Sequence, residues 1–310
     1  DLVWRDRWQI SSTEIATAKM ASTPTSAFAP GLFAGKRALV TGGGTGIGLA
    51  ITSELLRLGA SVLIASRSEE KLSAARATLS AHAGRLHTFA TNVRKEDEIV
   101  ALVEHAVSMM GGLDLLVNNA GGQYVAAADS LSAKGFRAVI ETNLVGSFLC
   151  AREAYRQWME EHGGAIVSIT MVTNNGLPKM AHSGAARAGV DNLTKSLAIE
   201  WSAAGVRVNS VAPGIIFTPS GFKNYGALGP PMVDAVAPAT PMQRLGTAEE
   251  IAAAVVFLLS PAAAFCTGQV LCVDGGISLV GYPPPMKELG DTSKFPIWGD
   301  ESVLPPNAKL

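Results

Sequence analysis

The chain has 310 residues, of which 48% are hydrophobic and 16% charged, and its formal net charge is −1 at pH 7. This length suits one large domain with a core that needs no cross-links, and the near-neutral charge excludes a bulk attraction to nucleic acid or acidic membranes. No apolar run approaches the ~18 residues of a membrane-spanning helix. Cys150, Cys266 and Cys272 are too few and too scattered for a disulfide framework or a zinc site. We therefore expect no metal site and three buried, reduced thiols.

The first 34 residues show no sustained periodicity and become rich in Ser, Thr and Pro in "MASTPTSAFAPG". We expect residues 1–34 to form a flexible extension outside the fold, with Met20 as a candidate natural start. A mitochondrial presequence is an alternative, which Asp1, Asp6 and Glu14 disfavour because such peptides are poor in acidic residues.

From Lys36 onward, short apolar or β-branched runs alternate with longer helical stretches. The runs are "KRALV", "SVLIAS", "LHTFAT", "LDLLV", "AIVSI", "VRVNSV" and "QVLCV". Strands that alternate with helices indicate crossover connections and a parallel sheet buried on both faces. The sequence therefore predicts a single doubly wound, Rossmann-type α/β domain over residues 35–280, with about seven strands and helices on both faces.

Two segments rich in Pro and Gly depart from this rhythm. Residues 218–241, "TPSGFKNYGALGPPMVDAVAPATP", are too long for an ordinary connection, and such loops are usually functional or disordered. Residues 281–310 contain "YPPPM" and "LPPNAKL" and are expected to form an extended or mobile surface tail.

The stretch "ALVTGGGTGIGLAI" is the strongest local signal. Glycines let backbone N–H groups approach a pyrophosphate closely, and the N-terminus of the following helix faces the anion. The spacing is G-x-x-x-G-x-G rather than G-x-G-x-x-G, but its place on the first strand of a βαβ unit favours a dinucleotide site over mere tight packing. The residues predicted to bind the cofactor here are Gly42, Gly44, Thr45, Gly46, Ile47 and Gly48.

The end of the second predicted strand, "IASRSEEK", indicates which dinucleotide binds. A site for NAD places an acidic residue here to accept from the ribose 2′-hydroxyl, whereas an arginine suits a 2′-phosphate. Ser66 and Arg67 occupy this point, and a guanidinium can bind phosphate through two parallel hydrogen bonds. The sequence therefore predicts NADPH as the cofactor. A solvated surface role for Arg67 is the alternative.

Further motifs follow at regular intervals: "NNAGG" (Asn118–Gly122), "ETNLVGSF" with Asn143, "VNSVAPG" (Asn209–Gly214) and "TGQVLCVDGG" (Thr267–Gly276). With "TGGGTGIG", they make residues 36–276 resemble the short-chain dehydrogenase/reductase family. The resemblance implies that Asn92 and Val93 flank the adenine. The other cofactor contacts that it implies are Asn119, Ala120, Gly121, Thr170, Arg187, Pro213, Gly214, Ile216 and Thr218.

Within the family, "NNAGGQ", "VIETNLVGSF", "EEHGGAIVSI", "HSGAARAGV" and "FLLSPAAAF" look most like stretches of the peroxisomal trans-2-enoyl-CoA reductases. The peroxisomal 2,4-dienoyl-CoA reductases are a near second, which "PMQRLG" and the final residues also suit. Ala308-Lys309-Leu310 is a close variant of the S-K-L tripeptide that the peroxisomal import receptor reads. We therefore expect a peroxisomal protein that binds this receptor through its C-terminus.

The stretch His182–Trp201, "HSGAARAGVDNLTKSLAIEW", departs from the family's catalytic pattern. The resemblance implies a Ser-Tyr-Lys triad, in which tyrosine gives its proton to a carbonyl oxygen while lysine lowers that pKa and holds the nicotinamide ribose. Here Ser183 takes the tyrosine position and Arg187 the lysine position, and the serine position falls near Thr170–Met171. The carbonyl-reducing triad is therefore absent.

Reduction of a conjugated C=C bond has a smaller need for an acid. Hydride goes to C3 of an enoyl thioester, charge builds on the thioester oxygen, and preorganised hydrogen-bond donors can stabilise that enolate. We expect Ser183 to donate to this oxygen and Arg187 to bind the ribose, because residues four apart share a helix face. Asp191 could pair with Arg187, and by resemblance Asn143 anchors this helix and a water.

The donor of the proton to C2 stays open among Tyr124, Thr173, His182, Tyr225 and bound water. His182 and Ser183 cannot both face the substrate, because helix neighbours point roughly 100° apart, so a structural role for His182 is preferred. In the substrate loop, an acyl tunnel and a contact to the phosphates of coenzyme A are expected from Phe222, Tyr225, Leu228, Met232 and Val233, and from Lys223 respectively.

The leading interpretation is an NADPH-dependent trans-2-enoyl-CoA reductase of peroxisomal fatty-acid metabolism, with an acyl-CoA as substrate. Reduction of 2,4-dienoyl-CoA is the second. A catalytically silent NADPH-binding protein is the third, which the missing tyrosine and lysine support. By resemblance, subunits pair through helices around residues 139–162 and 182–201, so a homodimer or homotetramer is expected.

Overall fold

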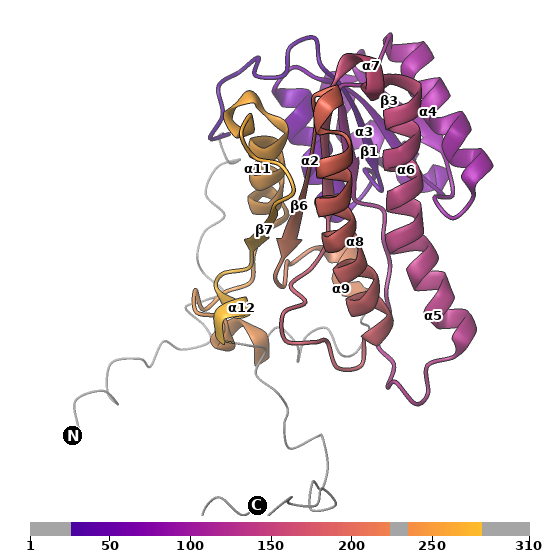
Figure 1. Ribbon diagram of the computed structural model, residues 1–310. Helices are drawn as coiled ribbons and strands as arrows, with labels where there is room; N and C mark the ends of the chain where they lie inside the picture. The colour runs from indigo at the N-terminus through magenta and orange to yellow at the C-terminus, as the bar shows by residue number, and fades with distance from the viewer. Residues whose placement is uncertain (1–25, 224–234, 281–310) are drawn as a thin grey trace, which may run out of the picture.

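The computed structural model describes residues 26–223 and 235–280, which form a parallel sheet covered by helices (Figure 1). The sheet has seven strands in the order β3-β2-β1-β4-β5-β6-β7, and every neighbouring pair is parallel. The strands are β1 (Arg37–Thr41), β2 (Ser61–Ser66), β3 (Leu86–Ala90), β4 (Leu115–Asn118), β5 (Gly164–Ile169), β6 (Val206–Pro213) and β7 (Val270–Val273). Each of the seven predicted runs forms a strand, so the predicted fold class is confirmed.

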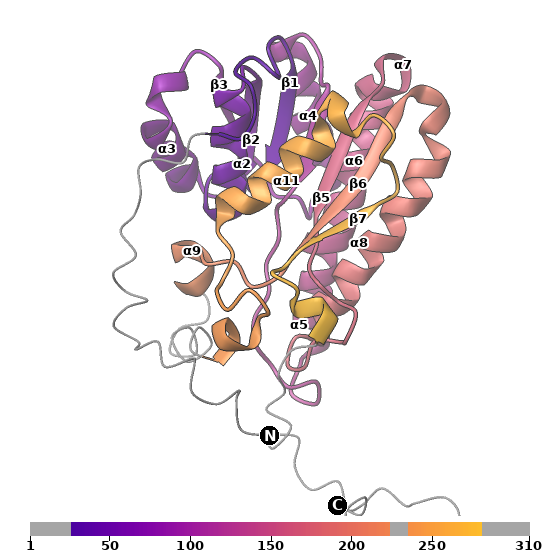
Figure 2. The same ribbon diagram turned by 90° about the vertical axis from the view of Figure 1, so that its left-hand side faces the viewer.

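Helices cover both faces of the sheet, as the two views of the ribbon show (Figures 1 and 2). One face packs against α2 (Gly46–Arg57), α3 (Glu69–Thr78) and α11 (Ala248–Leu259), and the other against α4 (Glu96–Met110), α6 (Gly146–Ala154) and α8 (Ala181–Glu200). Within β1, Ala38 and Val40 join the first core and Leu39 joins the second. Strand side chains alternate between faces, and both faces are buried here, so the runs read as continuously apolar.

The remaining helical elements are short. They are α5 (Ala133–Ile140), α7 (Glu160–His162), α9 (Pro219–Lys223), α12 (Ile277–Val280), 3₁₀ turns at Ser80–His82, Ser202–Ala204 and Pro261–Ala263, and π-helical segments at Glu141–Val145 and Tyr155–Met159. The first π segment connects α5 to α6 and contains the buried Asn143. Such segments occur frequently at functional sites.

Helix ends follow local chemistry. α4 begins with three acidic residues in its first turn, and Gly111, whose φ of 72° suits glycine, caps its C-terminal end. α11 begins with a capping box, in which the Thr247 hydroxyl accepts from the Glu250 N–H and the Glu250 carboxylate accepts from the Thr247 N–H. These signals fix where each helix starts and stops.

The described part of the predicted N-terminal extension, residues 26–34, packs against the domain, which corrects that prediction. Phe33 is only 2% exposed and joins the core beside α2, and its N–H donates to the Leu58 carbonyl at 2.9 Å. Ser26 also donates to Glu54 of α2. The buried ring and these hydrogen bonds hold the segment, although its sequence carries no periodic pattern. Residues 1–25 lie outside the described residues.

Several predictions fall on segments that the structure does not describe. Residues 224–234 include Tyr225, Leu228, Met232 and Val233, and residues 281–310 include the terminal tripeptide. The side chains of Phe222 and Lys223 are likewise outside the described part.

Among the three cysteines, Cys150 is buried, and burial raises the pKa of its thiol to about 12. Cys266 is half-buried and Cys272 is exposed, so the prediction of three buried thiols is wrong for these two. Cys272 lies on the edge strand β7, where half of the side chains face outward.

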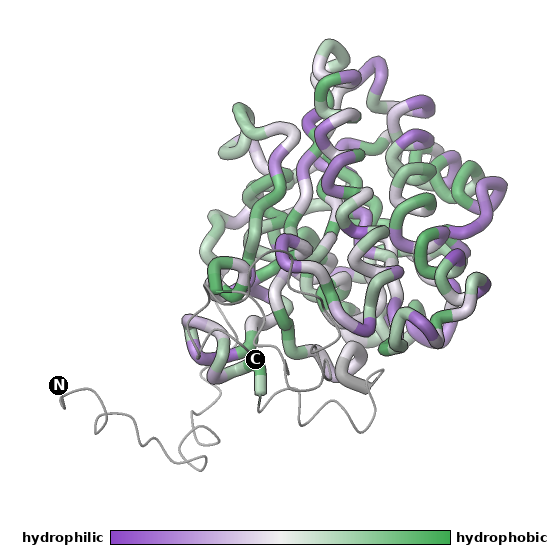
Figure 3. Tube along the Cα trace, turned by 60° about the horizontal axis from the view of Figure 1, so that its bottom comes forward, coloured by the Kyte–Doolittle hydropathy of each residue, from purple (hydrophilic) through white to green (hydrophobic). Residues whose placement is uncertain are grey.

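Figure 3 shows hydrophobic segments gathered inside the molecule and alternating polar and apolar turns on its helices. Within the described ranges, no helix combines the length and the apolar character needed to span a bilayer.

Candidate active site

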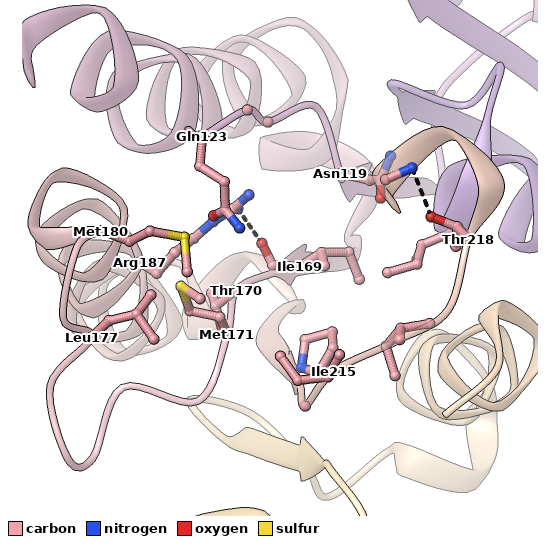
Figure 4. A pocket seen from close by; sticks show the side chains of 17 residues that line it. Asn119, Gln123, Ile169, Thr170, Met171, Leu177, Met180, Arg187, Ile215 and Thr218 are labelled. Carbon is pink, nitrogen blue, oxygen red and sulfur yellow. Dashed lines mark hydrogen bonds between the residues drawn. The ribbon is translucent and has the colours of Figure 1, made fainter. Parts of the chain in front are cut away.

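A cavity of about 290 Å³ opens at the carboxyl ends of β1, β4, β5 and β6 (Figure 4). The strand order reverses direction between β1 and β4, and ligands of open α/β sheets bind at such a switch point. The predicted site residues that line the cavity are Ile47, Asn119, Gly121, Thr170, Arg187, Pro213, Gly214, Ile216 and Thr218. Segments far apart in the sequence therefore meet around one space.

The glycine-rich turn after β1 has a backbone that only glycine suits. Gly42 and Gly46 have φ values of 66° and 53°, and a Cβ at Gly48 would overlap the Gly42 carbonyl and the Asn119 side chain. The next helix, α2, starts after Thr45, whose side chain makes no capping hydrogen bond within the described chain. The first-turn N–H groups of α2 are thus left for an anion, and the turn fits the pyrophosphate of a dinucleotide.

The loop after β4 is braced against this turn. The Thr41 hydroxyl accepts from the N–H groups of Asn119 and Ala120, both at 3.0 Å. The Asn119 amide donates back to the carbonyls of Thr41 and Gly42 at 3.0 and 3.1 Å. Asn119 and Ala120 therefore hold the glycine turn in shape, while their contact with a cofactor remains a prediction.

Ser66 and Arg67 lie at the carboxyl end of β2, as the strand pattern predicts. Ser66 is half-buried and its hydroxyl accepts from the Ser68 N–H at 3.4 Å. Arg67 is exposed, and it forms no hydrogen bond or ion pair with any other residue that the structure describes. An unpaired guanidinium at this point is available for a phosphate.

Asn92 and Val93 follow β3, outside the lining of the cavity. The Asn92 side chain accepts from the Arg94 N–H at 3.2 Å. Val93 is 7% exposed and packs against Gly146 of α6. Their predicted place beside an adenine ring is untested by these contacts.

Arg187 reaches the cavity from the buried face of α8 (Figure 4). The residue is 9% exposed, and its guanidinium donates to the carbonyl of Ile169 at the end of β5. Burial lowers the pKa of Arg187 to about 10, against a smaller raising effect of Asp191. The side chain is therefore cationic at neutral pH and cannot act as an acid there.

Asp191 does not form the expected ion pair, since among the described residues no oxygen of Asp191 lies within 4.0 Å of the Arg187 guanidinium. Burial raises the pKa of this carboxyl, while the Thr170 hydroxyl, Lys195 and Arg187 lower it to a smaller extent. The guanidinium instead donates to the Ile169 carbonyl at the end of β5. Thr170 itself is 4% exposed and donates to the Val211 carbonyl at 3.3 Å.

Ser183 is behind the cavity wall rather than in it. Its hydroxyl donates to Gln123 Oε1 at 2.6 Å and lies 3.6 Å from Met171 Sδ. Gln123 and Met171 line the cavity, and Ser183 is completely buried beneath them. Two longer side chains cover the short one, and the expected contact between Ser183 and a substrate stays a prediction.

Asn143 holds the loop that carries Gln123. It is completely buried, accepts from the Gly122 N–H at 3.0 Å and donates to the Gly122 carbonyl at 2.8 Å. A Cβ at Gly121 would collide with Arg187 and lie 2.6 Å from Asn143 Oδ1. These two bonds hold the backbone of the loop, and the role that the resemblance implies, anchoring α8 and a water, stays a prediction.

Three of the candidate proton donors, Tyr124, Thr173 and His182, do not line the cavity. A Cβ at Gly135 of α5 would overlap the Tyr124 hydroxyl, so that hydroxyl points to α5. The Tyr124 ring stands perpendicular to that of His182 at 4.7 Å. His182 is fully buried and its Nδ1 accepts from the Ser183 N–H at 2.9 Å, which agrees with a structural role. Thr173 follows β5 and does not line the cavity.

Sequence reasoning missed the side chains that form much of the wall. They are Gln123, Met171, Leu177 and Met180. No motif marks these residues, although Gln123 directly follows the "NNAGG" stretch. The described residues contain no group of three or more His, Cys, Asp or Glu side chains placed to hold a metal ion.

Comparison with known proteins places this site in a family. The family model described as Enoyl-(Acyl carrier protein) reductase matches residues 42–278. The peroxisomal 2,4-dienoyl-CoA reductase, (3E)-enoyl-CoA-producing, of Pongo abelii is 40% identical over 270 residues, or 86% of this chain and 92% of that protein. That relative carries the name of the second of the two groups that the motifs resemble.

Solved structures agree. The citronellol catabolism dehydrogenase of Pseudomonas aeruginosa PAO1 superposes with a TM-score of 0.73 at 42% identity, over 82% of this chain and 99% of that one. A short-chain type dehydrogenase/reductase from Mycobacterium ulcerans gives a TM-score of 0.74 at 33% identity, over 80% and 91%. The chain belongs to the short-chain dehydrogenase/reductase family.

Proposed function

We propose that this protein is an NADPH-dependent reductase that saturates the C=C bond of trans-2-enoyl-CoA thioesters. One observation carries the proposal: the dinucleotide side of the cavity keeps its family form, while a covered serine, Ser183, and a buried guanidinium, Arg187, occupy the family's tyrosine and lysine positions. An enzyme of this family without a phenol at that place has lost the acid that carbonyl reduction needs.

The residues around the cavity fit NADPH. The glycine turn of residues 42–48 would take the pyrophosphate, and the unpaired Arg67 would take the 2′-phosphate. Arg187 would donate to the nicotinamide ribose, while Pro213, Gly214, Ile216 and Thr218 would bound the nicotinamide end. When bound there, NADPH supplies a hydride.

Reduction of the C=C bond requires electrostatic stabilisation of the enolate. It does not require an acid that protonates the thioester oxygen. As C3 of the acyl chain gains hydride, the electron pair of the C=C bond moves toward the thioester oxygen, and C2 then takes a proton from solvent. Fixed dipoles and a cation in a water-poor cavity stabilise this transient charge. Arg187 contributes a positive charge there, and its high pKa keeps it from giving up a proton at neutral pH.

Reduction of 2,4-dienoyl-CoA is a second candidate, which the named relative favours. The extended enolate would again carry its charge on the thioester oxygen, and C5 would be the hydride acceptor. The two reactions therefore use the same stabilising groups, and they differ in the distance between the oxygen and the reacting carbon.

A peroxisomal location and an acyl-CoA partner are part of the proposal, in keeping with the name of that relative. Ala308-Lys309-Leu310 would be the address for the import receptor. Attachment of these residues to a fluorescent protein should direct it to peroxisomes, and deletion of the tripeptide should leave the protein in the cytosol. Pairing into a homodimer or homotetramer through the α6 and α8 faces remains a prediction for light scattering.

The activity is tested by following NADPH oxidation with purified protein. A trans-2-enoyl-CoA and a 2,4-dienoyl-CoA of equal chain length are supplied separately. The proposal predicts faster turnover of the enoyl substrate, and a higher kcat/KM for the dienoyl substrate would replace it with the second candidate. Tight NADPH binding with no oxidation of either substrate would instead identify a silent NADPH-binding protein.

A further inference from the structure

A second cavity, of about 200 Å³, opens at the amino ends of β4, β5 and β6, beside the residue that precedes β1. Its walls come from the N-terminal segment, the starts of these strands, the end of α7 and the end of α11. Figure 1 shows α7 at the end of the sheet opposite to α9 and α12. The proposed reaction uses none of these residues, so this amino-end cavity is separate from the cavity that Arg187 lines.

The floor of the amino-end cavity is apolar. It contains Phe33, Leu115, Ala165 and Leu259, which are 2%, 4%, 3% and 3% exposed. Contact with such a surface is favourable for a hydrocarbon group, because both are removed from water. At the ~30 Å³ that one water molecule occupies in the liquid, a cavity of about 200 Å³ holds about seven groups of that size. A ligand of this cavity is therefore small and partly hydrocarbon.

The rim of the cavity carries more positive than negative charge. Among the described residues, the ionisable side chains that line it are Lys36, Asp114, His162 and Arg207. Asp114 already accepts from Arg37 Nε and Nη2 at 2.7 and 3.0 Å, so a residue outside the wall balances its charge. Lys36 Nζ lies 3.8 Å from Asp114 Oδ1, beyond hydrogen-bonding distance. The ammonium group of Lys36 is therefore available to an anion.

Arg207 is a half-buried cation without a carboxylate partner in the described part of the chain. Its guanidinium donates to the carbonyls of Leu258, Leu259 and Ser260 at 2.6, 3.1 and 3.2 Å. Burial lowers the pKa of Arg207, against a smaller raising effect of Cys266. The carbonyls satisfy its donors and stabilise the fold, but they carry no full negative charge. An anion in the cavity would balance the charge that remains.

We propose that the amino-end cavity is a binding site for a short-chain monocarboxylate. The carboxylate accepts from Lys36 Nζ and is attracted by Arg207, while the hydrocarbon body lies against Phe33, Leu115 and Leu259. Charge complementarity selects an anion, and the apolar floor selects a ligand with a hydrocarbon body over an inorganic anion. The inference goes beyond the proposed function and does not depend on it, because no group of the other cavity takes part.

Pentanoate is the probe, because its size matches the volume of the cavity. When it is titrated into the full-length protein saturated with NADPH and followed by ligand-observed NMR, it should bind with a Kd of about 1 mM. Pentanamide has the same shape without the charge, and inorganic phosphate has charge without the hydrocarbon body. Each of these two should bind at least about 10-fold more weakly.

Three results of this titration would overturn the inference. Equal binding of pentanamide would show that the cations do not recognise the ligand. Equal binding of phosphate would show a general cationic patch that makes no use of the apolar floor. The third is an absence of pentanoate binding at about 20 mM, well above the expected Kd.

Lys36→Met tests the charge directly. It keeps an unbranched side chain and removes the ammonium group at an exposed position, so the fold should be retained. The Kd for pentanoate should rise by at least about 10-fold, the equivalent of one charge-assisted hydrogen bond. Lys134→Met, at an exposed lysine of α5 outside the cavity, is the matched control and should leave the Kd unchanged. Wild-type affinity in the Lys36 variant would contradict the proposed site.

Leucine methyl signals locate the bound ligand. In protein labelled with ¹³C at its leucine methyl groups, pentanoate should shift the signals of Leu115 and Leu259. The signal of Leu177, which lines the cavity with Arg187, should not move. A shift of Leu177 alone would place the carboxylate beside Arg187 and overturn the inference. None of these measurements follows turnover, so a failure of the proposed function would leave their results unchanged.

Discussion

Charged side chains at the two ends of the parallel sheet differ in how completely they are hydrogen-bonded. At the amino ends, Arg37 donates to both oxygens of Asp114 at 2.7 and 3.0 Å, and Arg207 donates to the carbonyls of Leu258, Leu259 and Ser260. At the carboxyl ends, Arg187 has one carbonyl partner among the described residues. The buried atoms Asp191 Oδ1 and His182 Nε2 have no hydrogen-bond partner among the described residues.

This difference separates stability from function. Paired charges at the amino ends satisfy each other and stabilise the fold. Incompletely paired groups at the carboxyl ends are costly to bury, and the expected compensation is a ligand that completes their hydrogen bonds. Substitutions at the carboxyl ends should therefore mainly lower activity. Substitutions at the amino ends should mainly lower the free energy of unfolding.

The largest effect is expected for Gly48→Val at the carboxyl end. A side chain there would overlap the Gly42 carbonyl and the Asn119 amide, so the phosphate-binding turn must open. Affinity for NADPH, measured by fluorescence titration, should fall by at least about 100-fold, or ~2.7 kcal/mol. Gly84→Val is the control, because nothing lies within 4 Å of a Cβ at Gly84. Wild-type affinity in the Gly48 variant would contradict the assignment of this turn.

The sharpest comparison of the two ends uses the buried Arg187 and the half-buried Arg207. Arg187→Met should lower kcat/KM by about 100-fold because it removes the cation from the cavity. Arg207→Met removes a guanidinium that bonds backbone carbonyls at the amino end, so it should lower the melting temperature and leave kcat/KM of the folded protein unchanged. Equal losses of activity in both variants would remove the distinction between the two ends.

A smaller change is expected at the end of β2. Arg67→Asp should lower affinity for NADPH by about 10-fold or more and shift preference toward NADH, because a carboxylate repels the 2′-phosphate and accepts from a ribose hydroxyl. Arg137→Asp, at an exposed arginine of α5, controls for the change in net charge. An unaltered ratio of the two affinities would return Arg67 to the solvated surface.

The smallest effect on activity is expected at the amino end, for Asp114→Asn. Burial alone raises the pKa of Asp114, but hydrogen bonds from Arg37 outweigh it and hold the pKa below its usual value. A carboxyl with a depressed pKa stabilises the fold above its unfolded pKa, and that stability is lost as the pH falls through the folded pKa. The variant should lose about 2 kcal/mol of unfolding free energy at neutral pH.

Urea unfolding at neutral pH and at a pH below the folded pKa of Asp114 measures this difference. The difference in free energy of unfolding between wild type and variant should be smaller at the acidic pH. The variant's kcat/KM should stay at the wild-type value. A gap that is the same at both pH values would show that the ion pair does not account for the stability.

The sequence was sufficient for the architecture because strands buried on both faces leave uninterrupted apolar runs, and all seven formed strands. The glycine turn was also predictable. Its backbone conformation admits only glycine at several positions, and the glycines can be read directly from the sequence. Arg187 was placed on the cavity by helical spacing from the family motif alone.

What the sequence could not predict depends on side chains that meet across the fold. That Gln123 covers Ser183 follows from the length of one side chain and the approach of a loop to α8, and neither is written in a local pattern. Spacing also suggested an ion pair of Asp191 with Arg187, but a strand-end carbonyl competes successfully for the guanidinium. Burial of Phe33 likewise depends on a groove that only the folded domain provides.

The central claim, that this site reduces a C=C bond and not a ketone, is tested most directly by comparing the two kinds of substrate. A trans-2-enoyl-CoA and a 3-ketoacyl-CoA of the same chain length are offered in separate assays with NADPH, and kcat/KM is compared. A cavity whose described lining has hydrogen-bond donors but no phenol should favour the enoyl thioester by at least about 100-fold. Comparable or faster reduction of the ketone would mean that a proton donor for the carbonyl oxygen is present, and the account would be wrong.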